Sequence, residues 1–214
     1  MANIAILGGT GYTGGNIAAE AAARGHSVTS YSRTLPEQPV DGVDYRTGDL
    51  QDAATITRAI SGADVVVGAL APRGELEGKL RALYGRIADA AADAGARWGV
   101  VGGFSSLRAA EGAGRIAFSG EVPAQFLEEA QTLAYVAHDL TASRDDLDWF
   151  FVSPAATYGS YAPGEKLGHY RVGGEVALVA DTGPSTISGA DYAAAFVDEI
   201  ENPVHRRAQF GVAY

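Results

Sequence analysis

Glycines recur at every third position near the start of the chain, at Gly8, Gly11 and Gly14. Glycine permits positive φ angles in a tight turn, and its lack of a Cβ lets a ligand approach the backbone closely. In such a loop, free backbone N–H groups and the positive end of a following helix dipole point at one place. The spacing is a shifted form of the dinucleotide fingerprint G-x-G-x-x-G, so it predicts a pyrophosphate site. A plain strand–helix turn is the alternative.

A cationic side chain follows at the position, about twenty residues beyond the fingerprint, where NAD enzymes carry an acid for the ribose hydroxyls. Arg33 stands between Ser32 and Thr34, after a strand-like run over 26–31, and the next acid is Glu37. A guanidinium can grip a 2′-phosphate with two parallel hydrogen bonds, and the neighbouring hydroxyls suit the same group. The sequence therefore predicts NADP(H) rather than NAD(H). A solvated surface arginine is the alternative.

Small and polar residues follow the ends of the later predicted strands. Asp49 can face the adenine end of a cofactor, or it can cap a helix. The run 68–72 consists mainly of small residues, which leave room for a ribose or a flat ring. Ser105 or Ser106 can hydrogen-bond a substrate carbonyl or the cofactor amide, or serve a turn. Because ligands of open α/β sheets bind outside the carboxyl ends of strands, we expect these residues near the glycine loop.

Side chains for acid–base chemistry and stacking are few. Histidine suits proton donation near neutral pH, which makes His138 a candidate, although it stands on a long predicted helix among charges. Tyr158 and Tyr161, with His169-Tyr170, could line an aromatic acceptor pocket or pack in a small core. No two histidines have the i, i+4 spacing of metal ligands, and the chain has no cysteine, so we predict no metal site.

Apolar runs of strand length alternate with helical patterns along most of the chain. The run 3–7 is apolar without alternation, which is typical of a parallel strand covered on both faces. The predicted strands span 3–7, 26–31, 43–46, 63–67, 98–101, 149–152, 170–172, 176–179 and 208–214. The predicted helices span 14–24, 53–60, 76–94, 124–142 and 190–201. This alternation predicts an α/β fold with a doubly wound, mostly parallel sheet.

Composition narrows the class of protein. The chain has 214 residues, 47% of them hydrophobic, and a net charge of −10. We predict one NAD(P)-binding domain over 1–214, in which 155–214 contribute a small substrate-side lobe. The acidic balance disfavours nucleic acid and anionic lipid as partners. With no signal-type segment and no stretch of membrane-spanning length, we expect a soluble cytoplasmic protein, monomeric or homodimeric, whose partner is a small molecule.

Several motifs, taken in order, resemble the atypical short-chain dehydrogenase/reductases. They are the glycine loop 8–14, Ser32-Arg33, the runs 48–50 and 102–105, the segment 148–154 and the approach to the last helix over 185–193. Within that family the chain is similar to the NAD(P)H-binding group that includes biliverdin-IXβ reductase and flavin reductases. The resemblance covers nearly the whole chain and implies a Rossmann-like fold.

The resemblance also implies roles for individual residues. The glycine loop would hold the pyrophosphate, Arg33 the 2′-phosphate, and Asp49 with Leu50 the adenine. Residues 69–71 would flank the ribose, and Gly102, Gly103 and 154–156 the nicotinamide. The predicted cofactor-binding residues are therefore Gly8, Thr10, Gly11, Tyr12, Thr13, Gly14, Ser32, Arg33, Thr34, Asp49, Leu50, Ala69, Leu70, Ala71, Gly102, Gly103, Pro154, Ala155 and Ala156.

One departure from the family pattern bears on the reaction. Extended short-chain reductases carry Tyr-x-x-x-Lys on the helix before the sixth strand, whereas here Tyr135 is followed four residues later by Asp139. This suits an NADPH-dependent reductase whose acceptor, a flavin or a quinone, takes hydride and draws its proton from solvent. It equally suits an NADP-binding redox sensor without turnover. The candidate catalytic residues are Ser105, His138 and Tyr158.

Overall fold

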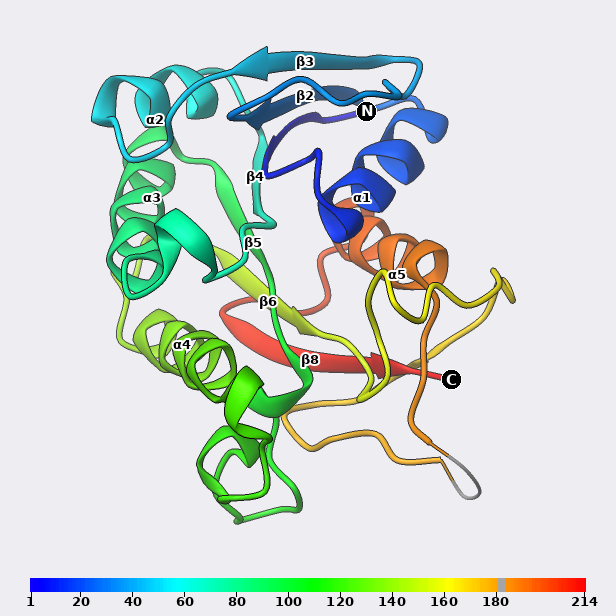
Figure 1. Cartoon of the computed structure of the whole chain (residues 1–214). Coiled ribbons are helices and arrows are strands. Elements are labelled where there is room, and N and C mark those ends of the chain that lie inside the picture. The colour runs from blue at the N-terminus through cyan, green and yellow to red at the C-terminus, as the bar shows by residue number, and fades with distance from the viewer. Residues whose placement is uncertain (181–183) are drawn as a thin grey trace.

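An eight-stranded sheet forms the centre of the computed structural model, which describes residues 1–180 and 184–214 (Figure 1). The strand order is β3-β2-β1-β4-β5-β6-β8-β7, and the neighbours pair in parallel except for β7 and β8. The strands are β1 (Asn3–Leu7), β2 (Ser27–Ser32), β3 (Val43–Thr47), β4 (Val65–Gly68), β5 (Arg97–Val101), β6 (Trp149–Ser153), β7 (Arg171–Val172) and β8 (Ala208–Ala213). The predicted doubly wound, Rossmann-like fold is confirmed.

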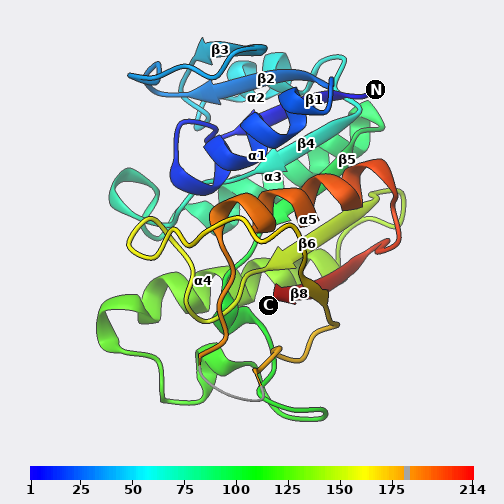
Figure 2. The ribbon, with the colours of Figure 1, turned by 90° about the vertical axis from the view of Figure 1, so that its right-hand side faces the viewer.

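Helices cover both faces of this sheet. They are α1 (Tyr12–Ala23), α2 (Ala53–Ile60), α3 (Leu80–Ala94), α4 (Ala124–Thr141) and α5 (Gly189–Glu201), with short 3-10 turns η1 (Gly74–Leu76), η2 (Phe104–Ser106) and η3 (Ile116–Phe118). Figures 1 and 2 show α1 and α5 on one face and α2, α3 and α4 on the other. No helix within the described ranges is both long and apolar enough to cross a membrane.

The strands alternate their side chains between two apolar layers. In β6, Trp149 and Phe151 pack into the cluster under α2, α3 and α4, whereas Phe150 and Val152 pack into the cluster under α1 and α5. A strand buried on both faces has no polar side, which explains the unbroken apolar runs of the sequence.

Local residue chemistry sets several helix ends. Asp52 caps α2 by accepting hydrogen bonds from the backbone N–H groups of Ala54 and Thr55, and Gly95 ends α3 with a φ of 66°. The predicted start of a helix at 76 was wrong, because α3 begins at Leu80. Gly74 and Gly78 have φ angles of 58° and 66°, so a continuous helix cannot pass through them.

One predicted strand does not form. The segment 176–179 makes a single bridge, from Val176 to Arg108, and otherwise has no strand structure. On the outer edge of β8, β7 pairs with Val212 and Ala213, and Gly173 and Gly174 bond Gly211, so the residues just before this segment already occupy the end of that edge. Elsewhere in 155–214, β8 extends the sheet beside β6, and α5 packs against α1.

The topology creates a crevice where the chain changes direction. β1 pairs with β2 on one side and with β4 on the other, and the backbone N–H of Ala69 donates to the carbonyl of Leu7 across 2.9 Å. The loops that leave β1 and β4 therefore diverge from a shared point at the carboxyl edge of the sheet. In open α/β folds this is the point at which ligands bind.

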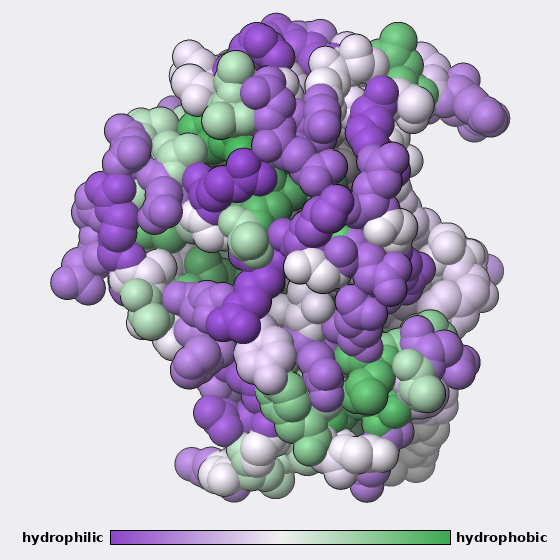
Figure 3. Space-filling view, turned by 60° about the vertical axis from the view of Figure 1, so that its left-hand side comes forward, coloured by the Kyte–Doolittle hydropathy of each residue, from purple (hydrophilic) through white to green (hydrophobic). Residues whose placement is uncertain are grey.

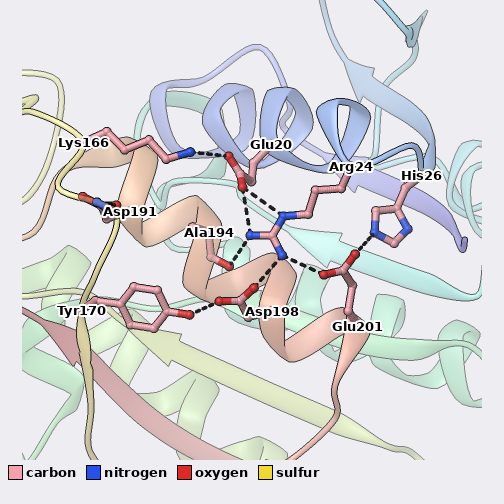
Figure 4. A network of polar contacts seen from close by, with 10 residues as sticks. Glu20, Arg24, His26, Lys166, Tyr170, Asp191, Ala194, Asp198 and Glu201 are labelled. Carbon is pink, nitrogen blue, oxygen red and sulfur yellow. Dashed lines mark hydrogen bonds and ion pairs between the residues drawn. The ribbon is translucent and has the colours of Figure 1, made fainter.

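A polar network fixes α1, which follows the glycine loop, against α5 (Figure 4). The Arg24 guanidinium lies 2.9 Å from Glu20, 2.5 Å from Asp198 and 2.7 Å from Glu201. Burial by itself would lower the pKa of Arg24, but hydrogen bonds to these three carboxylates raise it overall. The Arg24 cation at the end of α1 and the carboxylates of Asp198 and Glu201 on α5 hold the two helices together.

A buried carboxylate ties the last residue of the chain to the start of α5. Asp191 accepts hydrogen bonds from the backbone N–H groups of Leu167 and Gly168, at 2.7 and 3.0 Å, and from the hydroxyls of Ser188 and Tyr214, at 3.0 and 2.5 Å. Burial alone would raise the pKa of Asp191, but these donors outweigh it and the pKa is lowered. The ionised carboxylate therefore stabilises the fold.

We predict that Asp191→Asn lowers the free energy of unfolding by about 2–4 kcal/mol at pH 7, because an amide cannot accept from all four donors. The lowered native pKa means that this stabilisation is complete above the unfolded pKa of about 3.9 and is lost as the pH falls through the native pKa. Urea unfolding at pH 7 and 3.5 should show the difference from the parent protein shrinking with acid. Asp145→Asn, at a fully exposed carboxylate, is the control; an equal loss in both variants would contradict the assignment.

Candidate functional site

Three adjoining cavities run along the carboxyl edge of the sheet. The first, the β2-side cavity, has a volume of about 320 Å³, and the other two, the central and α4-side cavities, each about 470 Å³. The β2-side and central cavities share Gly11, Arg73 and residues 69–71, and the central and α4-side cavities share Gly103, Glu129 and Tyr158. Together they form one groove across the switch point of the sheet.

The three glycines of the loop are needed for different structural reasons. Gly8 has a φ of 97°, and a Cβ there would lie 2.7 Å from the carbonyl oxygen of Ala69. A Cβ on Gly14 would collide with the carbonyl oxygen of Gly8. A Cβ on Gly11 would make only an ordinary contact of 3.4 Å with the carbonyl oxygen of Gly8, and Gly11 lines both the β2-side and the central cavity. Gly8 and Gly14 therefore serve packing, whereas Gly11 keeps the groove open for a ligand.

The start of α1 presents free donors to this groove. The first hydrogen bond of the helix runs from the N–H of Gly15 to the carbonyl of Gly11, at 2.8 Å. Within the described ranges, no hydrogen bond engages the backbone N–H groups of Tyr12, Thr13 or Gly14. Unpaired N–H groups at the positive end of a helix dipole are the arrangement that binds anions such as pyrophosphates in proteins.

The β2-side cavity contains Arg33 together with an acid that the sequence analysis missed. The side chain of Arg33 is 70% exposed, and its Nη1 lies 2.7 Å from Oε2 of Glu75 on η1. Ser32 lines the cavity too, and its buried Oγ has no hydrogen-bond partner among the described residues. Thr34 is exposed and does not line the cavity, so the structure does not bring it together with Ser32 and Arg33.

Asp49 and Leu50 also line the β2-side cavity. Leu50 is buried against the core under α2 and α3, while Asp49 Oδ1 accepts a hydrogen bond of 2.8 Å from the backbone N–H of Gln51. Asp49 thus shapes its own turn and faces the cavity as well. The helix-capping role considered for it belongs to Asp52.

The central cavity collects the remaining predicted cofactor residues. Its walls include Tyr12, Thr13, Ala69, Leu70, Ala71, Gly102, Gly103, Pro154, Ala155 and Ala156. Leu70 is held by the buried Tyr84, whose hydroxyl accepts a hydrogen bond of 2.9 Å from the Leu70 backbone N–H. Thr10 lines only the β2-side cavity of the two.

Tyr158 stands between the central and α4-side cavities. Its hydroxyl donates to Thr13 Oγ1 at 2.9 Å, and its ring packs 4.8 Å from Tyr192 and 5.8 Å from Tyr12. Burial raises the pKa of Tyr158 well above its usual value. The phenol therefore stays protonated through the neutral range and acts here as a hydrogen-bond donor.

The other two candidate catalytic residues, Ser105 and His138, differ in whether they line the groove. Ser105 lines the α4-side cavity, whereas Ser106 is buried and its Oγ donates to the carbonyl of Gly103 at 2.5 Å, which is the turn role. His138 is exposed and lines none of the three cavities. It lies five residues beyond Leu133, a wall residue, and thus about 140° around α4. The structure does not bring His138 to the groove.

Two charged residues that sequence reasoning missed form an ion pair across the groove. Arg73, on the loop after β4, directs its Nε to Oε2 of Glu129 on α4 at 2.7 Å, and both line the central and α4-side cavities. The helical spacing of Phe126, Ala130 and Leu133 marks the same face of α4 and could have located Glu129. No spacing in the sequence points to Arg73.

The predicted aromatic pocket forms in part. Tyr158 and Tyr161 line the central and α4-side cavities. Tyr170 instead donates its hydroxyl to Asp198 in the α1–α5 network, and His169 lies 6.1 Å from the ring of Tyr214.

Among the described residues, no group of three or more histidine and acidic side chains could hold a metal ion.

Tyr135 and Asp139 point elsewhere than the groove. The Arg81 guanidinium of α3 lies over the Tyr135 ring at 4.7 Å and bonds both carboxylate oxygens of Asp139, at 2.6 and 2.7 Å. Tyr135 also packs 5.3 Å from Phe118. These side chains join α3 to α4, and neither lines the three cavities.

Comparison with known proteins agrees with this geometry. The sequence profile of an NAD(P)H-binding family matches residues 8–203. The Bacillus subtilis protein YwnB is 34% identical over 215 residues, which cover 98% of this chain and 97% of that protein. The chain belongs to this NAD(P)H-binding family of the atypical short-chain dehydrogenase/reductases.

Two solved structures are similar over the whole chain. One is a candidate exported protein from Burkholderia pseudomallei, 40% identical, with a TM-score of 0.87 and full coverage of both chains. The other is a candidate NADH-flavin reductase from Streptococcus pneumoniae, 28% identical, with a TM-score of 0.84 and coverage of 100% of this chain and 99% of that one.

We predict that Gly11→Ala and Gly14→Ala act differently. A Cβ at Gly11 has room within the protein but enters the groove, so the variant should fold normally and bind NADP⁺ at least about tenfold more weakly. A Cβ at Gly14 meets the backbone of Gly8, so that variant should unfold more easily. Calorimetric titration and thermal unfolding measure the two effects. Unchanged NADP⁺ affinity in a folded Gly11→Ala protein would contradict the role given to Gly11.

Proposed function

We propose that the protein is an NADPH-dependent reductase that passes hydride to a flat conjugated acceptor of the flavin or quinone type. The observation that carries this proposal is the order of the three cavities. A cavity with Arg33 leads past the free donors of α1 to a central cavity, and this opens into an aromatic-walled one. That sequence of environments matches a phosphorylated adenosine, a pyrophosphate, a nicotinamide and a flat acceptor.

The residues present fit this cofactor. The N–H groups of Tyr12, Thr13 and Gly14 would hold the pyrophosphate, and Arg33 with the unpartnered Ser32 hydroxyl would hold the 2′-phosphate. Asp49 and Leu50 would flank the adenine, and residues 69–71 the ribose. Gly102, Gly103 and 154–156 would border the nicotinamide, which supplies the hydride when the cofactor is bound.

The polar groups of the groove favour an acceptor that needs no protein proton relay. Tyr135 and Asp139 are engaged with Arg81, and His138 is exposed away from the cavities, so the usual tyrosine–lysine machinery is absent from the described groove. Ser105, Tyr158 and Tyr161 are the hydroxyl-bearing residues that line the α4-side cavity and could orient an acceptor there. An acceptor that takes hydride at nitrogen or a conjugated carbon can receive its proton from water.

The direct test is steady-state oxidation of NADPH with riboflavin, FMN and naphthoquinones as acceptors. Turnover above the uncatalysed rate with at least one of them is expected. NADPH binding without reduction of any acceptor would, together with the absent tyrosine–lysine pair, support a redox-sensing protein that binds NADP without turnover. Absence of both binding and turnover would remove both functions.

We predict that Arg33→Ala weakens NADP⁺ binding by about 1.5–3 kcal/mol, as expected for lost hydrogen bonds between charged groups, and leaves NAD⁺ binding nearly unchanged. Arg46→Ala is the matched control, because Arg46 is an exposed arginine on neighbouring β3 that does not line the β2-side cavity. Titration calorimetry of the parent protein and both variants with each nucleotide gives the affinities to compare. Equal losses for NADP⁺ and NAD⁺ in Arg33→Ala would contradict the 2′-phosphate role.

We predict the opposite sign for Glu75→Gln. The Glu75 carboxylate occupies Nη1 of Arg33, so a 2′-phosphate must displace it or share the guanidinium. Removing the charge should tighten NADP⁺ binding about two- to fivefold, in keeping with the small energy of an exposed ion pair. NAD⁺, which lacks the phosphate, should gain less. A weaker affinity for NADP⁺ in this variant would show that Glu75 orients Arg33 rather than competes for it.

A further inference from the structure

The α4-side cavity is walled mainly by apolar side chains. Phe104, Ile116, Val122, Phe126, Leu133 and Tyr161 all line it. Phe126 and Tyr161 are 48% and 75% exposed, so large rings stand open to solvent at this cavity. Figure 3 shows a hydrophobic area in its lower part, at the height of the start of α4 in Figure 1, and further hydrophobic areas higher up between hydrophilic side chains. Such walls bind flat rings by stacking and by burial of apolar surface.

The charges that line this cavity have a negative balance. Arg73 is the one cation among its lining residues within the described ranges, and the acids are Glu121 and Glu129. Arg73 is already paired with Glu129, through its Nε at 2.7 Å and its Nη2 at 2.5 Å. Glu121 is exposed and has no ion pair among the described residues. The whole chain carries a net charge of −10, which adds to the same field.

An anionic acceptor therefore gains little here. A phosphate drawn to Arg73 would have to displace Glu129, whose side chain is 27% exposed, and would leave that carboxylate without its partner. It would also approach Glu121 and be repelled. An uncharged ring meets none of these costs and keeps the full contact with the aromatic walls.

We propose that the acceptor of this site is an uncharged flat conjugated ring, such as a quinone or an unphosphorylated isoalloxazine, and that Glu121 and Glu129 discriminate against a phosphorylated one. This inference rests on the proposed reductase function. In the reaction the acceptor ring gains a hydride, with its electron pair, from the nicotinamide and a proton from water. NADPH is oxidised to NADP⁺, and the acceptor is reduced by two electrons.

The test compares acceptors with the same ring and different charge. Riboflavin and FMN differ by one phosphate, and 1,2-naphthoquinone and its 4-sulfonate differ by one sulfonate. At low ionic strength kcat/KM should be at least about fivefold higher for the uncharged member of each pair, and the ratio should shrink as salt is added. FMN reduced as well as riboflavin, or better, would overturn the inference while the reductase function stands.

Variants that each remove one carboxylate charge show which residues cause the selectivity. Glu121→Gln and Glu129→Gln should each lower the riboflavin-to-FMN ratio of kcat/KM by about two- to threefold, because each removes a repelling charge. Glu128→Gln is the matched control, with the same charge change on an exposed residue of α4 that does not line the cavity. Its ratio should equal that of the parent protein. A ratio lowered equally by Glu128→Gln would assign the selectivity to net charge and overturn the role of the two acids.

A binding measurement separates the failure of this inference from the failure of the reductase function. Quenching of flavin fluorescence in the presence of saturating NADP⁺ gives the affinities of riboflavin and FMN without turnover. Riboflavin bound more tightly than FMN by a protein that does not oxidise NADPH would support the selectivity and reject the reductase. Equal affinities, or no binding of either flavin, would reject the selectivity.

Discussion

The close packing of the first loop against the ends of β1 and β4 is the constraint on which the rest of the structure depends. Gly8 turns with a φ of 97° beside the carbonyl of Ala69, and Gly14 rests on the carbonyl of Gly8. A Cβ on Gly8 would collide with the loop after β4, and a Cβ on Gly14 would push α1 away from the glycine loop. Because Gly8 and Gly14 have no side chain, α1 begins within reach of the crevice and aims its free N–H groups into it.

The elements after 155 support this arrangement from a distance. Arg24 holds α1 to α5 through Asp198 and Glu201, and the buried Asp191 holds the start of α5 to the chain end and to 167–168. Tyr158 donates to Thr13 at the start of α1. The segment that was predicted as a substrate-side lobe thus meets the glycine loop and α1 through the Tyr158–Thr13 hydroxyl pair, through the Tyr12 hydroxyl, which donates to the carbonyl of Pro163, and through the α1–α5 interface.

The predictions from sequence succeeded where the signal is local. The apolar runs of β1, β4 and β6 and the glycine loop follow from neighbouring residues, and the fold and the cofactor family follow from them. The predictions failed where a partner far along the chain decides. The segment 176–179 has the composition of a strand, but residues 171–174 already occupy the end of the outer edge of β8. His138 was chosen by residue type, and its place around α4 relative to Leu133 turns it from the groove.

Glu75 and Arg73 show why charges in the groove were beyond sequence reasoning. Each stands on the loop after β4, and each pairs with a residue many positions away, Arg33 after β2 and Glu129 on α4. They meet these partners only because β4 lies beside β1, at the centre of the sheet. The Arg33–Glu75 pair is exposed on both sides, at 70% and 66%, and is therefore weak enough for a ligand with stronger charges to exchange it, whereas Glu129 is only 27% exposed. At the β2 side a 2′-phosphate offers Arg33 such an exchange, whereas an uncharged acceptor leaves the Arg73–Glu129 pair in place. The loop after β4 thus contributes to two ion pairs. A ligand can replace the one at the β2 side of the groove, and the one at the α4 side stays intact.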